Sequence, residues 1–187
     1  MTRFLLAALL ASASLPTLAD DYSDTLRVFR HAGQSAEFFK KSYGYAVFPT
    51  IGKGGLVVGG AHGSGRVYRA GKHVGDTTMT QVTVGLQLGG QAYSEMIFFQ
   101  NKKVFDQFTS GSFEFGAQAS AIAITAGASA QTTTGGTGAA ASGTQSHAKT
   151  HSNYHRGMAV FTVAKGGLMY EASLGGQKFD YTPRGKK

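Results

Sequence analysis

Three histidines in the C-terminal half of the chain are spaced as metal ligands on a helix would be. His147, His151 and His155 recur every four residues, and on a helix their imidazoles would share one side and bind zinc or copper. The residues around them are polar and show no helical periodicity. Closing a flexible loop around an ion costs conformational entropy. We therefore predict no ordered metal site, and these three histidines are the candidates if one exists.

Acid–base catalysis requires carboxyl groups that face one cavity. The chain has ten acidic residues, and Glu95, Glu114 and Glu171 fall in strand-like segments. Two of these carboxyl groups could face one cavity, but residue type is the only support for this arrangement. A hydrolase with an unrecognised site is therefore kept only as an alternative function. The sequence has no Gly-x-Ser-x-Gly nucleophile elbow, no Walker-type phosphate loop and no Gly-x-Gly-x-x-Gly after a strand. We predict no enzymatic activity and no cofactor.

A basic and aromatic stretch near the N-terminus has the composition of a membrane-binding segment. It contains Arg27, Arg30, Phe38, Phe39, Lys40 and Lys41. Basic residues attract anionic head groups, and apolar side chains of an amphipathic segment insert among the lipids. We predict that these six residues, with Lys53, form a lipid-binding surface. The structural alternative is a helix that packs its apolar stripe on a sheet and leaves its charges in water.

Two helical segments are predicted to position these residues. Apolar side chains recur every three or four positions across residues 20–42, as in an amphipathic helix. We expect Ser23 and Asp24 to cap its start and Gly33 to divide it into two helices. A short helix is predicted at residues 101–110, where Asn101 can cap the first turn.

From residue 45 onward, short β-prone runs broken by glycine predict an antiparallel sheet. These runs cover residues 45–51, 55–61, 65–69, 81–89, 96–99, 113–123, 158–163, 168–174 and 178–181. In the run 81–89, the apolar residues Val82, Val84, Leu86 and Leu88 alternate with polar ones, so we expect them to face the core. Tight links such as Ala70-Gly71-Lys72 favour hairpins. We predict an α+β fold: an antiparallel β barrel or sandwich with one or two N-terminal helices and a short helix near 101–110.

Residues 1–19 have the pattern of a cleaved signal peptide. Arg3 precedes an apolar run, and the small residues Thr17 and Ala19 fit a signal-peptidase site. A helix needs about 20 apolar residues to span a bilayer, and this apolar run is shorter. An uncleaved membrane anchor is therefore the less favoured alternative. We expect a mature protein that begins at Asp20 and is located in the periplasm or associated with the envelope.

The composition restricts the partners of the mature chain. The chain has no cysteine, and removing Arg3 with the leader lowers its net charge from +8 to +7. Such a charge favours anionic partners, which for an exported protein are lipid head groups, lipopolysaccharide or anionic polymers rather than nucleic acid. The length of residues 20–187 suits a single domain. A low-complexity loop rich in threonine, glycine, alanine and serine is predicted at about residues 126–156.

Five glycine-rich blocks occur in an order that resembles a known family. The blocks are Gly44-Tyr45-Ala46-Val47-Phe48-Pro49, Gly54-Gly55-Leu56-Val57-Val58-Gly59-Gly60, Gly63-Ser64-Gly65-Arg66-Val67, Val84-Gly85-Leu86-Gln87-Leu88-Gly89-Gly90-Gln91 and Lys165-Gly166-Gly167-Leu168-Met169-Tyr170-Glu171-Ala172-Ser173-Leu174-Gly175-Gly176. Over residues 25–181 this series resembles the SYLF domain, also called the Ysc-like lipid-binding family. The chain departs from that pattern in two places: it lacks a tryptophan before residue 82 and carries a histidine-bearing insertion between residues 125 and 157.

The resemblance implies a lipid-binding module. Eukaryotic members associate with phosphoinositide membranes and some with actin filaments, which an exported protein would not meet. We therefore predict an exported module that binds anionic phospholipid head groups or a membrane surface and performs no catalysis. A structural or stress-related envelope protein without a specific ligand is the alternative, and the hydrolase is a second one. The sequence identifies no protein partner.

Overall fold

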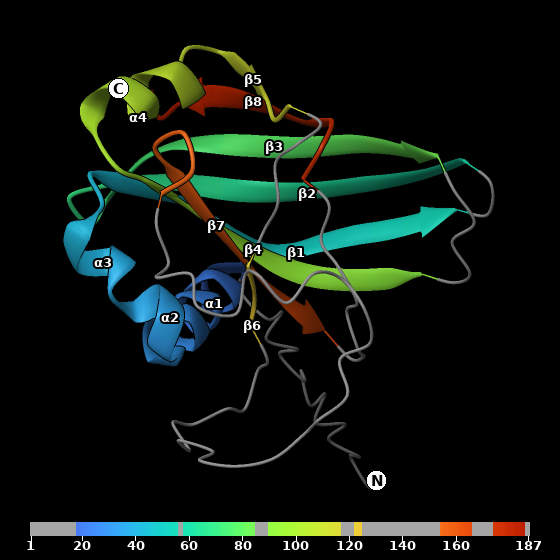
Figure 1. Ribbon diagram of the computed structural model, residues 1–187, viewed down its shortest axis with the longest axis horizontal. Coiled ribbons are helices and arrows are strands. Elements are labelled where there is room, and N and C mark those ends of the chain that lie inside the picture. Colours follow the sequence, from blue (N-terminus) through green and yellow to red (C-terminus); the bar gives the residue numbers. More distant parts are fainter. Residues whose placement is uncertain are drawn as a thin grey trace, which may run out of the picture.

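The computed structural model describes residues 18–55, 58–84, 90–116, 122–124, 154–165 and 174–185. Within these residues the chain forms four helices and eight strands (Figure 1). The elements are α1 Leu18–His31, α2 Gly33–Ala36, α3 Phe38–Lys41, β1 Gly44–Gly55, β2 Val58–Arg69, β3 Lys72–Val84, β4 Gln91–Phe99, α4 Lys102–Phe108, β5 Ser112–Glu114, β6 Ile122–Ile124, β7 Met158–Lys165 and β8 Gln177–Pro183. Residues 1–17 of the predicted signal peptide and most of the predicted low-complexity loop lie outside the described residues.

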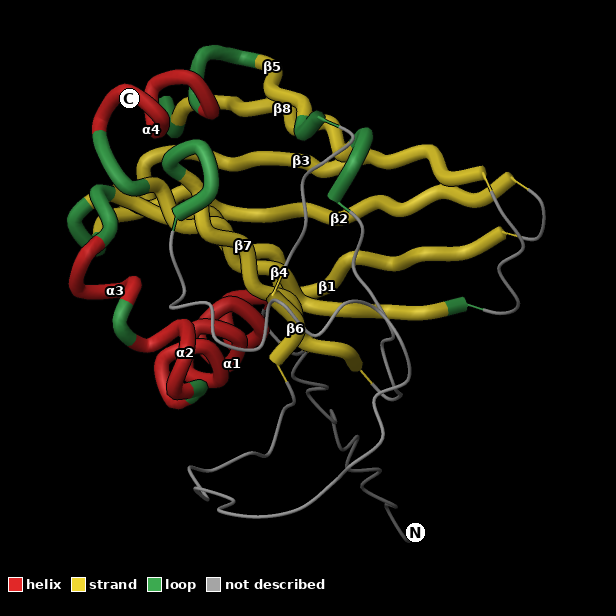
Figure 2. Tube along the Cα trace, in the orientation of Figure 1, coloured by secondary structure: helices red, strands yellow, loops and turns green. Residues whose placement is uncertain are grey.

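All eight described strands belong to one sheet, in the order β5-β8-β3-β2-β1-β4-β7-β6. Neighbouring strands are antiparallel except β6 and β7, which are parallel. The helices gather in two places, α1 to α3 beside one part of the sheet and α4 near β5 and β8 (Figure 2). The predicted α+β class and the mostly antiparallel pairing are confirmed.

The sheet curls around an inner core. Strands β8 and β4 are separated in the sheet by β3, β2 and β1, yet Gln177 of β8 donates a hydrogen bond to the Tyr93 hydroxyl of β4 at 3.3 Å. The rings of Phe48 and Phe179 meet inside the curl with their centroids 5.6 Å apart. In the described residues the end strands β5 and β6 do not pair with each other, so the curled sheet is not closed.

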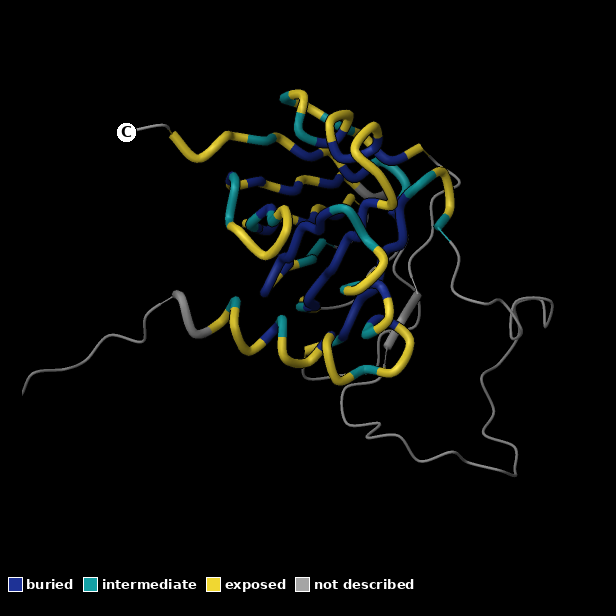
Figure 3. Tube along the Cα trace, turned by 90° about the vertical axis from the view of Figure 1, so that its left-hand side faces the viewer, coloured by how far each residue is buried: buried dark blue, intermediate teal, exposed yellow. Residues whose placement is uncertain are grey.

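A second core lies between the outer face of the sheet and α1 to α3. Phe29 and Phe38 of the helices pack there against Met96, Phe98 and Phe161 of the strands. Along these helices the buried positions recur about once per turn, so one side of each helix faces the sheet and the other faces solvent (Figure 3). Strand β4 is buried on both faces, which explains its unbroken apolar run at residues 96–99.

The N-terminal segment is helical as predicted, but it forms three helices rather than one or two, and the predicted cap is wrong. Helix α1 begins at Leu18, so Ser23 and Asp24 lie inside it rather than at its start. Tyr22 holds the first part of α1 to the sheet. The centroid of its ring lies 4.0 Å from the guanidinium carbon of Arg66, and its hydroxyl donates a hydrogen bond to the Ser64 carbonyl at 3.5 Å. None of the described helices is both long and apolar enough to cross a membrane.

Strand β2 runs through the glycines that were expected to interrupt it. Its inward positions include Gly63 and Gly65, where a Cβ atom would lie 2.6 Å from the side chains of Ile51 and Phe48. These glycines therefore make room for large residues of β1 rather than ending a strand. The predicted Ala70–Gly71 turn does join β2 to β3 as a hairpin, with positive φ angles of 49° and 75°.

The predicted orientation of the strand at residues 81–89 is wrong where the structure describes it. Val82 is 74% exposed, whereas Gln81 is 4% exposed and faces the core. The Gln81 side chain is satisfied there because it donates a hydrogen bond to the Gly175 carbonyl at 2.9 Å. The side chain of Val84 and all of Leu86 and Leu88 lie outside the described residues.

Candidate functional site

A shallow depression on the helical layer brings together most of the predicted lipid-binding residues. It is lined by Arg30, Ala36, Glu37, Phe39, Lys40 and Lys41 and has a volume of about 720 Å³. Helix α1 supplies the arginine, and α2, α3 and the residue between them supply the others. Three basic groups and one carboxylate face this space, so the depression carries a positive charge.

The corner between α1 and α2 fixes the relative positions of these residues. The hydroxyl of Ser35 is buried and donates hydrogen bonds to the carbonyls of Phe29, at 2.6 Å, and Ala32, at 3.3 Å. The bond to Phe29 gives a partner to a carbonyl in the last turn of α1, whereas the Ala32 carbonyl also accepts from the amides of Ser35 and Ala36. The Ser35 contact therefore holds α2 and α3 against α1 and keeps Arg30 close to Phe39.

Arg30 is held in place by aromatic neighbours. Its guanidinium carbon lies 4.7 Å from the centroid of the Phe39 ring, within the range of a cation–π contact. Burial raises the pKa of the Tyr45 hydroxyl, and the charge and hydrogen bond of Arg30 partly offset that rise. Both contacts leave a planar cation fixed at one side of the depression, where it can bind a phosphate or carboxylate with two hydrogen bonds.

The two lysines of α3 differ in their partners. Lys41 forms an ion pair with Glu37 at 2.8 Å, and both side chains are 65% exposed. The hydrogen bond and charge of Lys41 lower the pKa of Glu37, with a smaller contribution from Lys40. In the described structure Lys40 has no carboxylate within ion-pair distance. An anionic ligand would thus meet Lys40 directly but would compete with Glu37 for Lys41.

Three other predicted lipid-binding residues do not line the depression. Arg27 is exposed on α1 and pairs with Asp24 at 2.8 Å. Lys53 lies nine residues beyond the start of β1, which is about 30 Å along a strand, and α3 precedes that start. Phe38 is only 3% exposed and contacts Phe98, Phe161 and Tyr154. Its predicted insertion into a membrane is contradicted by this burial, because the periodicity of α3 turns Phe38 toward the sheet.

Of the three histidines considered as metal ligands, only His155 lies among the described residues. His147 and His151 lie outside the described residues, and His155 is exposed and forms an isolated backbone bridge with Met158. Across the described residues, no group of three or more histidine, cysteine, aspartate or glutamate side chains is arranged to hold a metal ion.

The carboxyl groups considered for acid–base catalysis do not share a cavity where they are described. Glu95 is fully buried in the inner core, whereas Glu114 is exposed and lies 3.8 Å from Lys178. Glu171 is outside the described residues.

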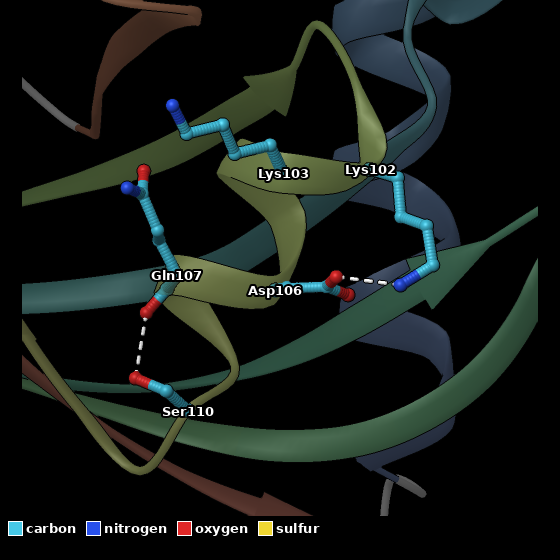
Figure 4. A pocket seen from close by; sticks show the side chains of 5 residues that line it. All are labelled: Lys102, Lys103, Asp106, Gln107 and Ser110. Atoms are coloured by element: carbon cyan, nitrogen blue, oxygen red, sulfur yellow. Dashed lines mark hydrogen bonds and ion pairs between the residues drawn. The ribbon is translucent and has the colours of Figure 1, made fainter.

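A second basic depression, which the sequence pattern did not single out, lies on α4 (Figure 4). It is lined by Lys102, Lys103, Asp106, Gln107 and Ser110. Lys102 forms an ion pair with Asp106 at 2.6 Å, and the Ser110 hydroxyl donates to the Gln107 carbonyl at 2.9 Å. The ion pair leaves Lys103 as the single uncompensated charge of this surface, which therefore attracts anions less strongly than the depression around Arg30.

Comparison with known proteins identifies the family. The model of the Ysc84 family, described as Las17-binding protein actin regulator, matches residues 80–182, which is more than half of the chain. This chain belongs to the Ysc84 family. The predicted SYLF resemblance is therefore confirmed. The chain is also similar to the beta cell expansion factor A of Aeromonas veronii, with 28% identity over 173 residues that cover 90% of this chain and 56% of that protein.

The Ysc84 match begins in β3 and ends in β8. It therefore contains the inner-core residues Glu95, Thr162 and Gln177 but does not reach the depression around Arg30. The similarity to the beta cell expansion factor extends over more of the chain and spans about half the length of that relative.

Proposed function

We propose that this protein is an exported, non-catalytic module that binds anionic phospholipid head groups at the depression around Arg30. The observation that carries the proposal is the convergence of Arg30, Phe39, Lys40 and Lys41 on one surface. Membership of a family with the SYLF domain supports a role at membranes, and the net charge, which is +8 for the full chain and +7 without Arg3 of the leader, favours anionic surfaces.

The geometry favours attraction by charge over deep insertion. Phe39 is half-buried, and its ring contacts Tyr45 and Phe98 with centroid distances of 5.3 and 4.9 Å. Only part of this ring can reach lipid. Each basic residue close to an anionic surface contributes about 1 kcal/mol. Arg30, Lys40 and Lys41 together would contribute about 3 kcal/mol, which corresponds to roughly a 100-fold change in affinity.

Co-sedimentation of residues 20–187, the chain without its predicted leader, with vesicles tests this proposal. We expect binding to phosphatidylglycerol vesicles, little binding to phosphatidylcholine vesicles, and release by salt, because screening shortens the reach of charges to about 8 Å at physiological ionic strength. The triple variant R30Q/K40Q/K41Q should bind anionic vesicles about 100-fold more weakly.

A matched triple variant separates local from overall charge. R69Q/K72Q/K103Q removes the same number of charges from exposed residues that form no described ion pair, and it should retain most of the binding. Greater loss in this variant would move the lipid surface to the β2–β3 turn or to the depression on α4. Equal binding of the unmodified chain to both vesicle types would contradict the proposal and favour a structural or stress-related envelope protein.

A further inference from the structure

A carboxyl group is enclosed in the inner core beside three polar side chains. Glu95 and Tyr93 lie on β4, Thr162 on β7 and Gln177 on β8, and we call these four residues the Glu95 cluster. Their exposed fractions are 0, 3, 1 and 0%, respectively. The Gln177 amide nitrogen donates to a carboxyl oxygen of Glu95 at 3.1 Å and to the Tyr93 hydroxyl at 3.3 Å. The cluster thus joins three strands across the interior of the curled sheet.

Three oxygens of this cluster have no hydrogen-bond partner in the described structure. They are Oε1 of Glu95, Oε1 of Gln177 and Oγ1 of Thr162. Glu95 and Thr162 are directly opposite each other in the β4–β7 register, which places their Cβ atoms about 5 Å apart. Gln177 touches the same carboxyl group. Buried oxygens without a partner cost about 1–3 kcal/mol each, so three in one cluster indicate a bound group that the protein chain does not supply.

The missing group must interact with oxygen acceptors and must compensate a negative charge when Glu95 is ionised. Among the described residues neither lysine nor arginine influences Glu95, and burial raises the pKa of its carboxyl to about 8. Carboxylate, amide and hydroxyl oxygens are the donor atoms that hard cations prefer. A single carboxylate neutralises a single positive charge, and a divalent ion would leave an uncompensated charge in the core.

The neighbouring side chains restrict the size of the bound group. Phe48 is opposite Glu95 in the β1–β4 register, and Phe179 follows Gln177 by two residues on the same face of β8. Both phenylalanines are fully buried and their rings are in contact. Packed aromatic rings on this side exclude a bulky ligand.

We propose that the Glu95 cluster is a binding site for a small monovalent cation, namely an alkali ion or ammonium. Glu95 supplies the charge, and the free oxygens of Thr162 and Gln177 complete the coordination. This site lies within the segment matched by the Ysc84 family and is separate from the depression around Arg30. It is therefore independent of the proposed lipid binding.

Thermal unfolding of the full chain in different chloride salts, at one ionic strength and at a pH above the raised pKa of Glu95, tests this proposal. At least one of lithium, sodium, potassium and ammonium should raise the unfolding midpoint relative to tetramethylammonium, which is too bulky for the site. Above the dissociation constant, a tenfold increase in that cation should lower the unfolding equilibrium constant about tenfold. A ¹⁵N-ammonium NMR signal with cross-peaks to the Thr162 methyl group would locate the ion directly.

Three variants distinguish the site from general salt effects. Glu95→Gln keeps the shape and removes the charge, so it should abolish the response to cations. Thr162→Val should weaken the response to cations. If Glu95→Gln does not fold, this second variant tests the proposal in its place. Thr77→Val is the matched control, because its hydroxyl is also buried without a partner but lies on β3 outside the cluster. Equal midpoints in all salts would indicate a water molecule and overturn the proposal, as would an unchanged response in Glu95→Gln.

Discussion

At the scale of single residues, Glu95 is the described carboxyl group whose ionisation is most strongly coupled to folding. Removal from water disfavours the charged carboxylate, and the single hydrogen bond from Gln177 offsets only part of that cost. The pKa of Glu95 is raised from 4.5 to about 8 in the folded chain. The folded state therefore retains a proton over a pH range in which the unfolded chain has released it.

This difference predicts that stability falls as the pH rises from about 4.5 to about 8. Between these values the unfolding equilibrium constant should increase up to tenfold per pH unit, because the folded state binds one proton more than the unfolded state. Glu95→Gln should remove this part of the slope. Denaturant titrations at several pH values, in a buffer whose cations are all bulky and organic, measure the effect. A variant with the same slope as the unmodified chain would show that other groups cause the pH dependence.

At the scale of secondary-structure elements, α4 is defined by a local signal at the residue that precedes it. The side chain of Asn101 accepts a hydrogen bond from the Val104 amide at 3.1 Å, and Val104, Phe105 and Phe108 are buried against the sheet. The cap satisfies an amide that has no partner within the helix. It also fixes the rotation at which the three apolar residues meet the inner core.

Replacing the α4 cap should lower stability by a measurable amount. Asn101→Ala removes the acceptor and should cost about 1 kcal/mol, which lowers the melting temperature by about 2–4 °C for a domain of this size. Asn101→Asp retains a capping oxygen and is the matched control. Circular dichroism of both variants provides the measurement, and equal losses in the two would mean that packing rather than the cap fixes α4.

Elements with local determinants were predictable from the sequence, and those that depend on distant partners were not. The cap of α4 and the Ala70–Gly71 turn are encoded within a few residues. The depression around Arg30 was also accessible, since its residues are close in sequence. In contrast, the partner of Glu95 is 82 residues away, and no periodicity relates the two positions.

Alternation along a strand also leaves its orientation ambiguous. In β3 the sequence contains apolar residues on one face and polar residues on the other, so burial of the valines was expected. The structure instead buries Gln81, because the interior offers the Gly175 carbonyl as a hydrogen-bond acceptor. Alternation therefore predicted the strand but not which face is turned toward a partly polar core.

At the scale of the whole molecule, one curled sheet serves two cores. Its inner face packs around Phe48 and Phe179, and its outer face carries Phe98 and Phe161 under the N-terminal helices. The family match starts at residue 80 and so excludes these helices. Nevertheless, Phe29 and Phe38 cover the outer face, and the same helices position Arg30 and Phe39. The helical layer thus connects stability with the proposed lipid surface.

Removing this layer should therefore disrupt the fold as well as lipid binding. Burial of a phenylalanine contributes about 1.5–3 kcal/mol to stability. The free energy of unfolding of a typical domain is about 5–15 kcal/mol, so losing Phe29 and Phe38 alone would remove a large part of it. Deletion of residues 1–42 should expose the outer aromatic face, increase the binding of a hydrophobic dye and abolish cooperative unfolding.

A chain lacking residues 1–17 is the reference for this deletion. The variant R30Q/K40Q/K41Q should still unfold cooperatively, because it changes charge without removing the buried rings. Cooperative unfolding of the shorter chain at an unchanged midpoint would show that the sheet is stable without its helical layer.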